Sequence, residues 1–193
     1  MTYLNPSDAV AQQENLTCQI FDELRNKTFD GIGVTRPSYG DGEQVARDIM
    51  AKVATRIGLV VEDDAAGNVY MTLKGNKTGA KPVIIGSHID SVAQGGNFDG
   101  AAGVVSGLIA CASLIEAGVT PSCDIKVMGI RAEESAWFGV SYIGSRSALG
   151  TLPPEALKNA KRADTGRSLY DHMRSAGCNP DDLKEGNVFL PPE

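Results

Sequence analysis

The sequence predicts a layered α/β domain in which helices flank a sheet. Two apolar runs, at 82–86 and 124–130, have the composition of strands, and the first has the unbroken apolar character of a strand that is buried on both faces. A helix-length segment rich in small residues, 99–116, joins them. A strand, a helix and a second strand in this order are typical of a βαβ unit inside a layered domain.

Helices are expected ahead of this unit. Ser7 and Asp8 precede an apolar pattern of helical spacing over 9–27, which predicts a first helix. Asp41 is a candidate cap for a second helix, and Gly58 is a candidate stop for it.

Short strands are expected between the second helix and the βαβ unit. The runs at 59–62 and 68–73 are rich in β-forming residues and are separated by a polar turn, so they form a hairpin or two adjacent strands. The helix at 99–116 should place its glycines on one side and direct four apolar side chains to the core: Val104, Leu108, Cys111 and Ile115.

The last part of the chain is more polar. Short helices are expected at 153–160, 166–176 and 179–185. The ending, 188–193, carries two prolines, which argue against a central strand.

Composition excludes several classes of protein. Lys and Arg number 18 against 24 Asp and Glu, a formal net charge of -6, which argues against a nucleic-acid partner because phosphate binding needs a basic face. No apolar stretch has the length of a membrane span, and the amino terminus does not resemble a secretory signal, so a cytoplasmic protein is expected. The four cysteines are scattered, which favours reduced, mostly buried thiols.

Acidic and imidazole side chains gather where the predicted strands end. His88 and Asp90 follow the first strand of the βαβ unit, Asp99 begins its helix, and Glu133 and Glu134 follow its second strand. Ligand sites in open α/β sheets lie at the carboxyl ends of strands, so these side chains are candidates for one metal site.

Each of these residues also has a purely structural interpretation. His88 could simply hydrogen-bond to Asp90 at a strand end, and Asp99 could cap the following helix. The glycines around Asp99, at 95–103, favour a loop packed closely around an ion instead. Glu133 and Glu134 could lie in a solvated loop, but their mutual repulsion after an apolar strand favours a bound cation.

Three ordered motifs carry a resemblance to a known family. The segments 86–92, 95–100 and 131–138, the last with Gly144-Ser145-Arg146, resemble the hydantoinase/carbamoylase family of metal-dependent amidohydrolases. That family includes N-carbamoyl-L-amino-acid hydrolases, allantoate amidohydrolases and bacterial-type β-ureidopropionases, and it is related to dimetal aminopeptidases. The resemblance implies the amino-terminal part of a dimetal aminopeptidase-like catalytic domain.

The resemblance also implies a role for each candidate. His88 would bind one metal ion, Asp99 would bridge two, and Glu134 would bind the second. Glu133 would be the general base and Asp90 would orient His88. The two divalent ions would be zinc, manganese, cobalt or nickel. A cis peptide bond is expected after Asp99.

Members of the family are longer than this chain, and further metal-binding histidines and a lid or dimerisation domain follow the matched region. Only one other histidine is present, His172, which lies in a short amphipathic segment and is expected at the surface. Residues 1–193 are therefore expected to form an incomplete catalytic domain. As an isolated chain, this domain could bind metal weakly or not at all.

Two hypotheses about function follow. In the first, the chain belongs to a hydrolase of linear amide C–N bonds in ureido compounds such as N-carbamoyl amino acids or allantoate. The chain would then derive from a longer enzyme or pair with a partner chain that carries the missing half. Its exposed strand edges could also make it self-associate. In the second, it is a catalytically silent truncated fragment. A serine or cysteine hydrolase is disfavoured, because neither histidine has a nucleophile and an acid at suitable spacing.

Overall fold

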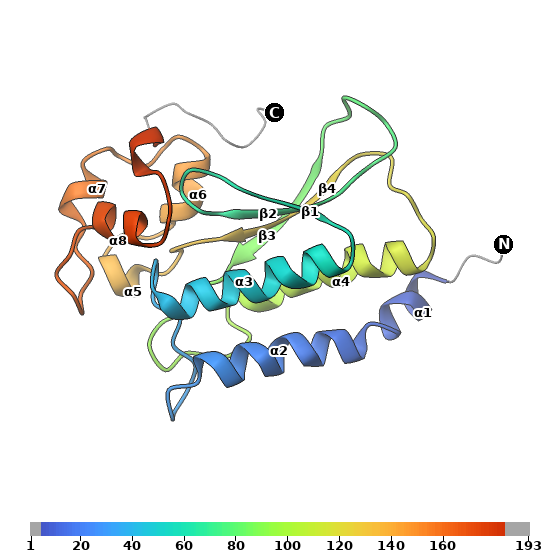
Figure 1. The fold of residues 1–193 in the computed structure, drawn as a ribbon, viewed down its shortest axis with the longest axis horizontal. Helices are drawn as coiled ribbons and strands as arrows, with labels where there is room; N and C mark the ends of the chain where they lie inside the picture. The colour runs from blue at the N-terminus through green and yellow to red at the C-terminus, as the bar shows by residue number, and fades with distance from the viewer. Residues whose placement is uncertain (1–4, 184–193) are drawn as a thin grey trace.

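The computed structural model describes residues 5–183, which form a four-stranded mixed sheet with helices on one face and at one end (Figure 1). The elements, in chain order, are α1 (Pro6–Ala11), α2 (Glu14–Thr28), α3 (Asp41–Arg56), β1 (Val60–Asp63), β2 (Val69–Leu73), β3 (Val83–His88), α4 (Ala101–Glu116), β4 (Ile125–Ile130), α5 (Ser135–Phe138), α6 (Ile143–Ala148), α7 (Ala156–Asn159), α8 (Leu169–Ser175) and a 3-10 helix (Pro180–Asp182).

The sheet confirms the predicted βαβ unit. Its strand order is β1-β2-β4-β3, in which β2 is antiparallel to β1 and to β4, and β3 is parallel to β4. The parallel register pairs Val83 with Ile125 and His88 with Ile130. Both strands therefore end at the same edge of the sheet, and the loops that follow them start side by side.

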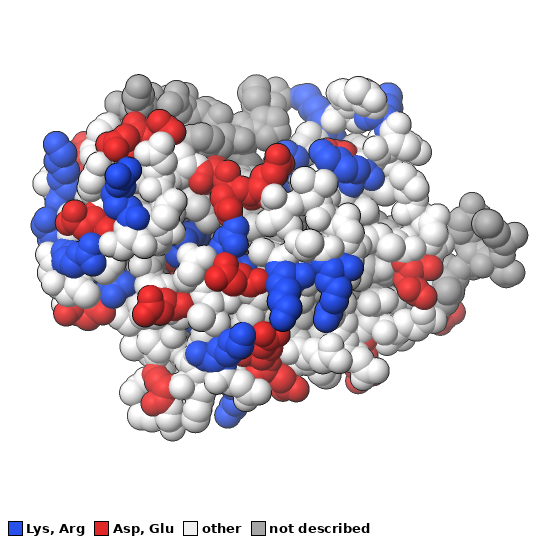
Figure 2. All heavy atoms as spheres, viewed as in Figure 1, with Lys and Arg blue, Asp and Glu red and all other residues white. Residues whose placement is uncertain are grey.

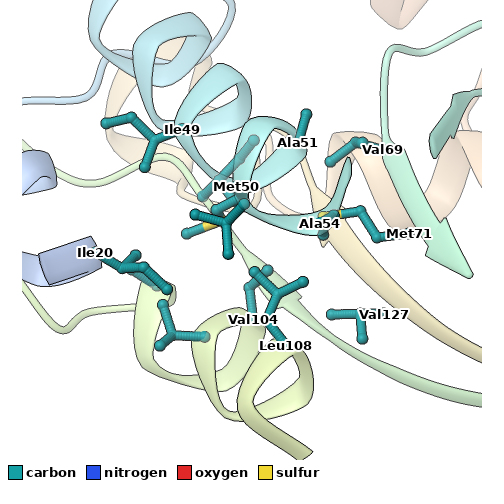
Figure 3. Close-up of a cluster of buried hydrophobic side chains, with 14 of the residues drawn as sticks. Ile20, Ile49, Met50, Ala51, Ala54, Val69, Met71, Val104, Leu108 and Val127 are labelled. Carbon is teal, nitrogen blue, oxygen red and sulfur yellow. The ribbon is translucent and has the colours of Figure 1, made fainter. Parts of the chain in front are cut away.

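Helices α3 and α4 cover one face of the sheet, and α2 packs against these two helices from outside (Figure 1). The main core fills the space between these helices and the strands, and Figure 3 shows Met50, Leu108 and Val127 pointing into it. Burial of apolar side chains on this scale is the main favourable contribution to folding. A second cluster, centred on Phe138, Ile143 and Leu169, packs α5, α6 and α8 at the end of the sheet.

Glycines let α4 approach the sheet closely. A Cβ on Gly107 would lie 2.8 Å from Cγ1 of Val127, and one on Gly103 would lie 2.5 Å from Cβ of Ser87. Both distances are shorter than real side-chain contacts. The glycine excess of the sequence therefore has a packing role along the helix that connects β3 to β4.

The predicted first helix is wrong in one respect, because it is two helices, α1 and α2. Asn5 caps α1 by accepting a hydrogen bond from the backbone of Ser7, and Pro6 occupies the first turn, where a missing N–H costs nothing. Val10, which the prediction included in the apolar pattern, lies in α1 and is 50% exposed. The core therefore does not require one continuous helix. The predicted helix over 41–57 is confirmed within one residue, with Gly40 rather than Asp41 as its cap.

The prediction that the strand at 82–86 is buried on both faces is also wrong. β3 is the last strand of the sheet, and Val83 and Ile84 are 50% and 37% exposed. Apolar composition shows that a strand is suited to burial, but burial itself depends on neighbouring elements. Residues 5–183 place no strand on the outer side of β3. Ile115, expected in the core, is 42% exposed near the end of α4.

The carboxyl-terminal helices are shorter than expected, at Ala156–Asn159, Leu169–Ser175 and the 3-10 turn Pro180–Asp182. The expectation for 188–193 lies outside the described residues. All four cysteines are free, as expected, although only Cys111 is fully buried.

Figure 2 shows Lys and Arg side chains interspersed with Asp and Glu over the face turned to the viewer, without a continuous basic area there. None of the helices in residues 5–183 combines the length and the apolar character of a segment that crosses a membrane.

The close approach of α4 predicts that Gly107→Ala destabilises the fold. The added methyl group would overlap Val127, so we expect a loss of about 1–3 kcal/mol in the free energy of unfolding, measured by chemical denaturation. Gly96→Ala is the matched control, because a Cβ there meets nothing within 4 Å. A Gly107→Ala chain as stable as Gly96→Ala would contradict this account of the packing.

Candidate metal centre

The candidate residues meet at the carboxyl ends of the two parallel strands. His88 is the last residue of β3, Asp90 follows two residues later, and Glu133 and Glu134 lie in the loop after β4. Asp99 lies two residues before the start of α4, which packs against β3 and β4. Parallel pairing and the short connection to α4 thus bring residues 45 positions apart in sequence, such as His88 and Glu133, into one place.

The imidazole of His88 is at the centre of the cluster. Its Nε2 atom lies 3.6 Å from Oδ1 of Asp99 and 3.8 Å from Oε2 of Glu133. His88, Glu133 and Glu134 each offer a ligand atom, and these atoms lie within 4.8 Å of one another. The sequence therefore predicted correctly which side chains come together.

On its other side, His88 faces Asp90. Its Nδ1 atom lies 3.3 Å from Oδ1 of Asp90 and 3.1 Å from the carbonyl oxygen of the same residue. Both atoms are hydrogen-bond acceptors, which places the proton of a neutral imidazole on Nδ1 and leaves the lone pair of Nε2 pointing to the carboxylates. This arrangement suits a histidine that binds a metal ion through Nε2.

Asp90 is fully buried and its carboxylate is saturated with hydrogen bonds. Oδ2 accepts from Oγ of Ser38 at 2.7 Å and from the backbone N–H of Glu134 at 3.1 Å, and Oδ1 accepts from the backbone N–H of Glu133 at 3.1 Å. Burial raises the pKa of Asp90, but the bonds from His88, Ser38 and Glu133 outweigh it and hold the pKa below its ordinary value. Asp90 is therefore an ionised anchor between the loops.

A buried ion pair supports the loop that carries the two glutamates. Glu43, on α3, accepts hydrogen bonds from Nε of Arg131 at 2.7 Å and from the backbone N–H of Ala132 at 2.8 Å. The guanidinium of Arg131 also lies over the ring of Tyr39, with 4.9 Å between the carbon and the ring centroid. Removing one partner of such a pair leaves a buried, uncompensated charge.

Sequence reasoning missed Glu43, Arg131, Ser38 and Arg36, all of which are fully buried or nearly so. One signal was available for Glu43: it shares the apolar stripe of α3 with Ala46 and Met50, where a charged residue needs a partner. Nothing in the sequence pairs it with Arg131, 88 residues away.

Acidic side chains outnumber basic ones around the site. Burial raises the pKa of Glu134, and the negative charge of Asp99 raises it further. Burial lowers the pKa of His88, but the hydrogen bond and the charge of Asp90 outweigh it, so that the pKa of His88 is raised to about 9. The carboxylates of Asp99, Glu133 and Glu134 lie near the imidazole of His88. Together these four side chains form a donor set whose chemistry and charge suit a divalent cation.

The structural interpretation of Asp99 as a helix cap is wrong. Gly100 is the capping residue of α4, and no side chain caps that helix. A Cβ on Gly100 would overlap the ring of His88, so this glycine allows the helix to start beside the imidazole. The expected cis bond after Asp99 is absent, since no peptide bond in the described residues is cis.

The prediction for His172 is also wrong. Its side chain is 4% exposed and packs edge-on against Phe138, with ring centroids 5.6 Å apart. Its Nε2 atom lies 2.8 Å from Oγ1 of Thr165. The short helix α8 is amphipathic, and His172 lies on the face that packs into the second cluster, away from the candidate metal centre.

Comparisons with known proteins agree with this geometry. Residues 68–162 match the sequence profile of Peptidase family M28. The chain is 42% identical over 153 residues to an N-carbamoyl-L-amino acid amidohydrolase from Geobacillus stearothermophilus, an alignment that covers 79% of this chain and 37% of the relative. It is 33% identical over 174 residues to a ureidoglycolate hydrolase from Oryza sativa subsp. japonica, covering 88% of this chain and 35% of the relative.

A crystal structure of an amidase of the hydantoinase/carbamoylase family from Burkholderia multivorans superposes with a TM-score of 0.79 at 28% identity, covering 90% of this chain and 42% of that one. The fold and the site thus define part of a carbamoylase- and aminopeptidase-like catalytic domain. The chain is similar to part of the proteins of the hydantoinase/carbamoylase family. It spans less than half the length of each of these three relatives.

The raised pKa of His88 predicts opposite effects of pH on stability and on metal affinity. An imidazole whose pKa is higher in the folded state stabilises the fold fully below its unfolded value of about 6.5. That contribution is lost as pH rises toward about 9. Divalent metal competes with the proton, so affinity should rise over the same interval.

Denaturation and metal titration of the metal-free chain and of His88→Gln, at pH values from 6.5 to 9, check this prediction. Only the difference between the two proteins reports on His88, because the cysteines of the unfolded chain also titrate at alkaline pH. The same slope of stability against pH in both proteins would contradict the assignment.

The saturated carboxylate of Asp90 predicts a specific failure in Asp90→Asn. The amide nitrogen cannot accept the hydrogen bonds from the backbone N–H groups of Glu133 and Glu134, so one of them loses its partner. We expect lower stability and a metal affinity reduced about 10–100-fold, measured by calorimetry. Asp124→Asn, at the start of β4 and remote from the site, should leave metal affinity unchanged.

Proposed function

We propose that this chain supplies metal-binding loops to a hydrolase of linear amide C–N bonds in ureido compounds. The observation that carries the proposal is the position of Nε2 of His88, 3.6 Å from Asp99 and 3.8 Å from Glu133, at the joint end of two parallel strands. Relatives named for N-carbamoyl-L-amino acids, ureidoglycolate and allantoate support ureido compounds as the substrate class.

In this proposal His88, Asp99 and Glu134 would hold the metal ions, and Asp99 would be shared by both. Asp90 holds the Nδ1 proton of His88 and so keeps Nε2 available as a ligand. The ions are zinc, manganese, cobalt or nickel, all of which accept imidazole and carboxylate donors. Bound divalent ions polarise the carbonyl group and lower the pKa of water, which a ureido carbonyl needs because two nitrogens donate into it.

Glu133 is proposed as the general base. Its carboxylate faces the same space as His88 and Asp99, and its side chain is partly exposed, so water and substrate can reach it. It takes a proton from the attacking water and delivers that proton to the leaving nitrogen. General catalysis of this kind contributes about 10²–10⁴-fold to the rate.

A second assignment of Glu133 has support from the geometry. The mutually close donor set in the described residues consists of His88, Glu133 and Glu134, and it does not include Asp99. In this alternative Glu133 binds an ion instead of moving a proton. The two assignments make different predictions for the same substitution.

We propose further that residues 1–193 form an incomplete catalytic domain. The chain covers 37% of the carbamoylase relative and 42% of the solved amidase, and in this proposal activity requires the remaining part of the domain. The competing hypothesis is a catalytically silent fragment that keeps the residues of the family.

Glu133→Gln separates the general base from a ligand. If Glu133 is the base, the variant keeps its metal content and loses at least about 10²-fold in turnover of N-carbamoyl amino acids or allantoate. If Glu133 is a ligand, it loses metal as Glu134→Gln does. Metal content is measured by mass spectrometry, and turnover by release of ammonia.

Both measurements are made on the chain alone and on the chain combined with a polypeptide that supplies the rest of a family member. Glu62→Gln, an exposed substitution on β1, is the matched control and should change neither quantity. Stoichiometric metal and turnover by the chain alone would contradict the incomplete domain. Metal binding without turnover in the combined protein would favour the silent fragment.

A further inference from the structure

Arg36 is a fully buried arginine beside the candidate metal centre. Its Nε atom donates to the carbonyl oxygen of Ile89 at 2.8 Å, and its Nη2 atom donates to the carbonyl oxygen of Asp99 at 2.8 Å. Ile89 lies between His88 and Asp90. One guanidinium therefore bridges the two backbone segments that carry His88 and Asp99.

The backbone of Arg36 is fixed to the same loop. Its N–H donates to Oγ of Ser91 at 3.0 Å, and its carbonyl oxygen accepts from the N–H of Ser91 at 3.0 Å. Two residues earlier, Val34 exchanges backbone hydrogen bonds with Gly95. The segment 34–36 thus lies alongside the loop between β3 and α4, and the side chain of Arg36 has little freedom to move.

The guanidinium has an unusual set of partners for a buried cation. It makes hydrogen bonds to carbonyl oxygens only, and Nη1 has no hydrogen-bond partner among the described residues. The charges of Asp90, Asp99 and Glu43 act on it through space. A buried, unsatisfied donor costs about 1–3 kcal/mol, so the arrangement is poorly explained by stability alone.

The choice of acceptors matters for the metal centre. A guanidinium that paired with the carboxylate of Asp99 would compete with a metal ion for its oxygens. Arg36 instead holds the carbonyl group of Asp99 and leaves the side chain free, 3.6 Å from Nε2 of His88. It also adds a positive charge near a group of carboxylates that repel one another.

We propose that Arg36 is a positioning residue of the metal centre, which sets the separation of His88 and Asp99 by bridging the backbone on either side of the ion. The inference rests on the proposed metal function of these two residues. A lysine keeps the charge but has a single nitrogen, so it cannot reproduce the planar fork that bridges both carbonyl groups.

The test uses the 193-residue chain combined with a polypeptide that supplies the rest of a family member. Co²⁺ is the probe, because its visible spectrum reports the geometry of its ligands. We expect Arg36→Lys and Arg36→Ala to bind Co²⁺ about 10–100-fold more weakly and to shift its absorption bands. Free guanidinium at millimolar concentration should partly restore the affinity of Arg36→Ala. Ile49→Ala, a core substitution remote from the site, controls for a general loss of stability.

The outcomes separate this proposal from the proposed function. If the unaltered chain binds Co²⁺ and Arg36→Lys binds it with the same affinity and spectrum, the role of Arg36 is contradicted and the metal centre stands. If the unaltered chain does not bind Co²⁺ even when it is combined with a polypeptide that supplies the rest of a family member, the metal centre and the role of Arg36 are both contradicted. A loss in Arg36→Ala that Ile49→Ala reproduces, without rescue by guanidinium, would reduce Arg36 to a structural residue.

Amide hydrogen exchange of the metal-free chain provides a measurement that does not depend on metal affinity. Loss of the bridge should speed exchange over 89–100 in Arg36→Lys and leave exchange in β2 and α3 unchanged. Uniformly faster exchange, or none, would contradict a local positioning role.

Discussion

The buried carboxylate of Asp90 is the interaction on which the geometry of the site depends. It binds three parts of the chain at once: the side chain of Ser38 ahead of α3, the imidazole of His88 at the end of β3, and the backbone of Glu133 and Glu134 after β4. A buried anion without such partners would be strongly destabilising. The same bonds that make its burial tolerable therefore fix the loops that carry the candidate ligands.

Two further constraints bring the loops into range of one another. The parallel register of β3 and β4 brings the loops after His88 and Ile130 out at the same edge. The glycines of α4 let the helix lie close to both strands, and Gly100 lets it start against the ring of His88. A side chain at Gly100, Gly103 or Gly107 would push α4 away from the sheet. Because these residues are glycines, Asp99 just ahead of α4 reaches the imidazole.

The sequence predicted the parts of this arrangement that are encoded locally. Apolar runs, small-residue spacing and acidic residues at strand ends were sufficient for the βαβ unit and for the residues gathered around His88. Glu43, Arg131 and Arg36 were missed because the hydrogen bonds that join Glu43 to Arg131 and Ala132, and Arg36 to Ile89, span 53 to 89 residues of sequence, and only the tertiary fold brings these groups together. His172 and β3 were misjudged for a related reason: a side chain or a strand is buried by its neighbours, and the local pattern does not say which neighbours are present.

The exposed edge of β3 and the donor set around His88 lie on the same side of the sheet formed by residues 5–183. β3 is the last strand of the sheet formed by residues 5–183, two of its apolar residues are at least 37% exposed, and it ends in His88. A parallel strand added at that edge would bury these residues and would end beside the imidazole. Any ligand following it would then face Nε2 of His88, since ligand sites form at the carboxyl ends of neighbouring strands. If the domain is incomplete, as proposed, a segment that extends the sheet beside β3 should therefore affect stability and metal affinity together.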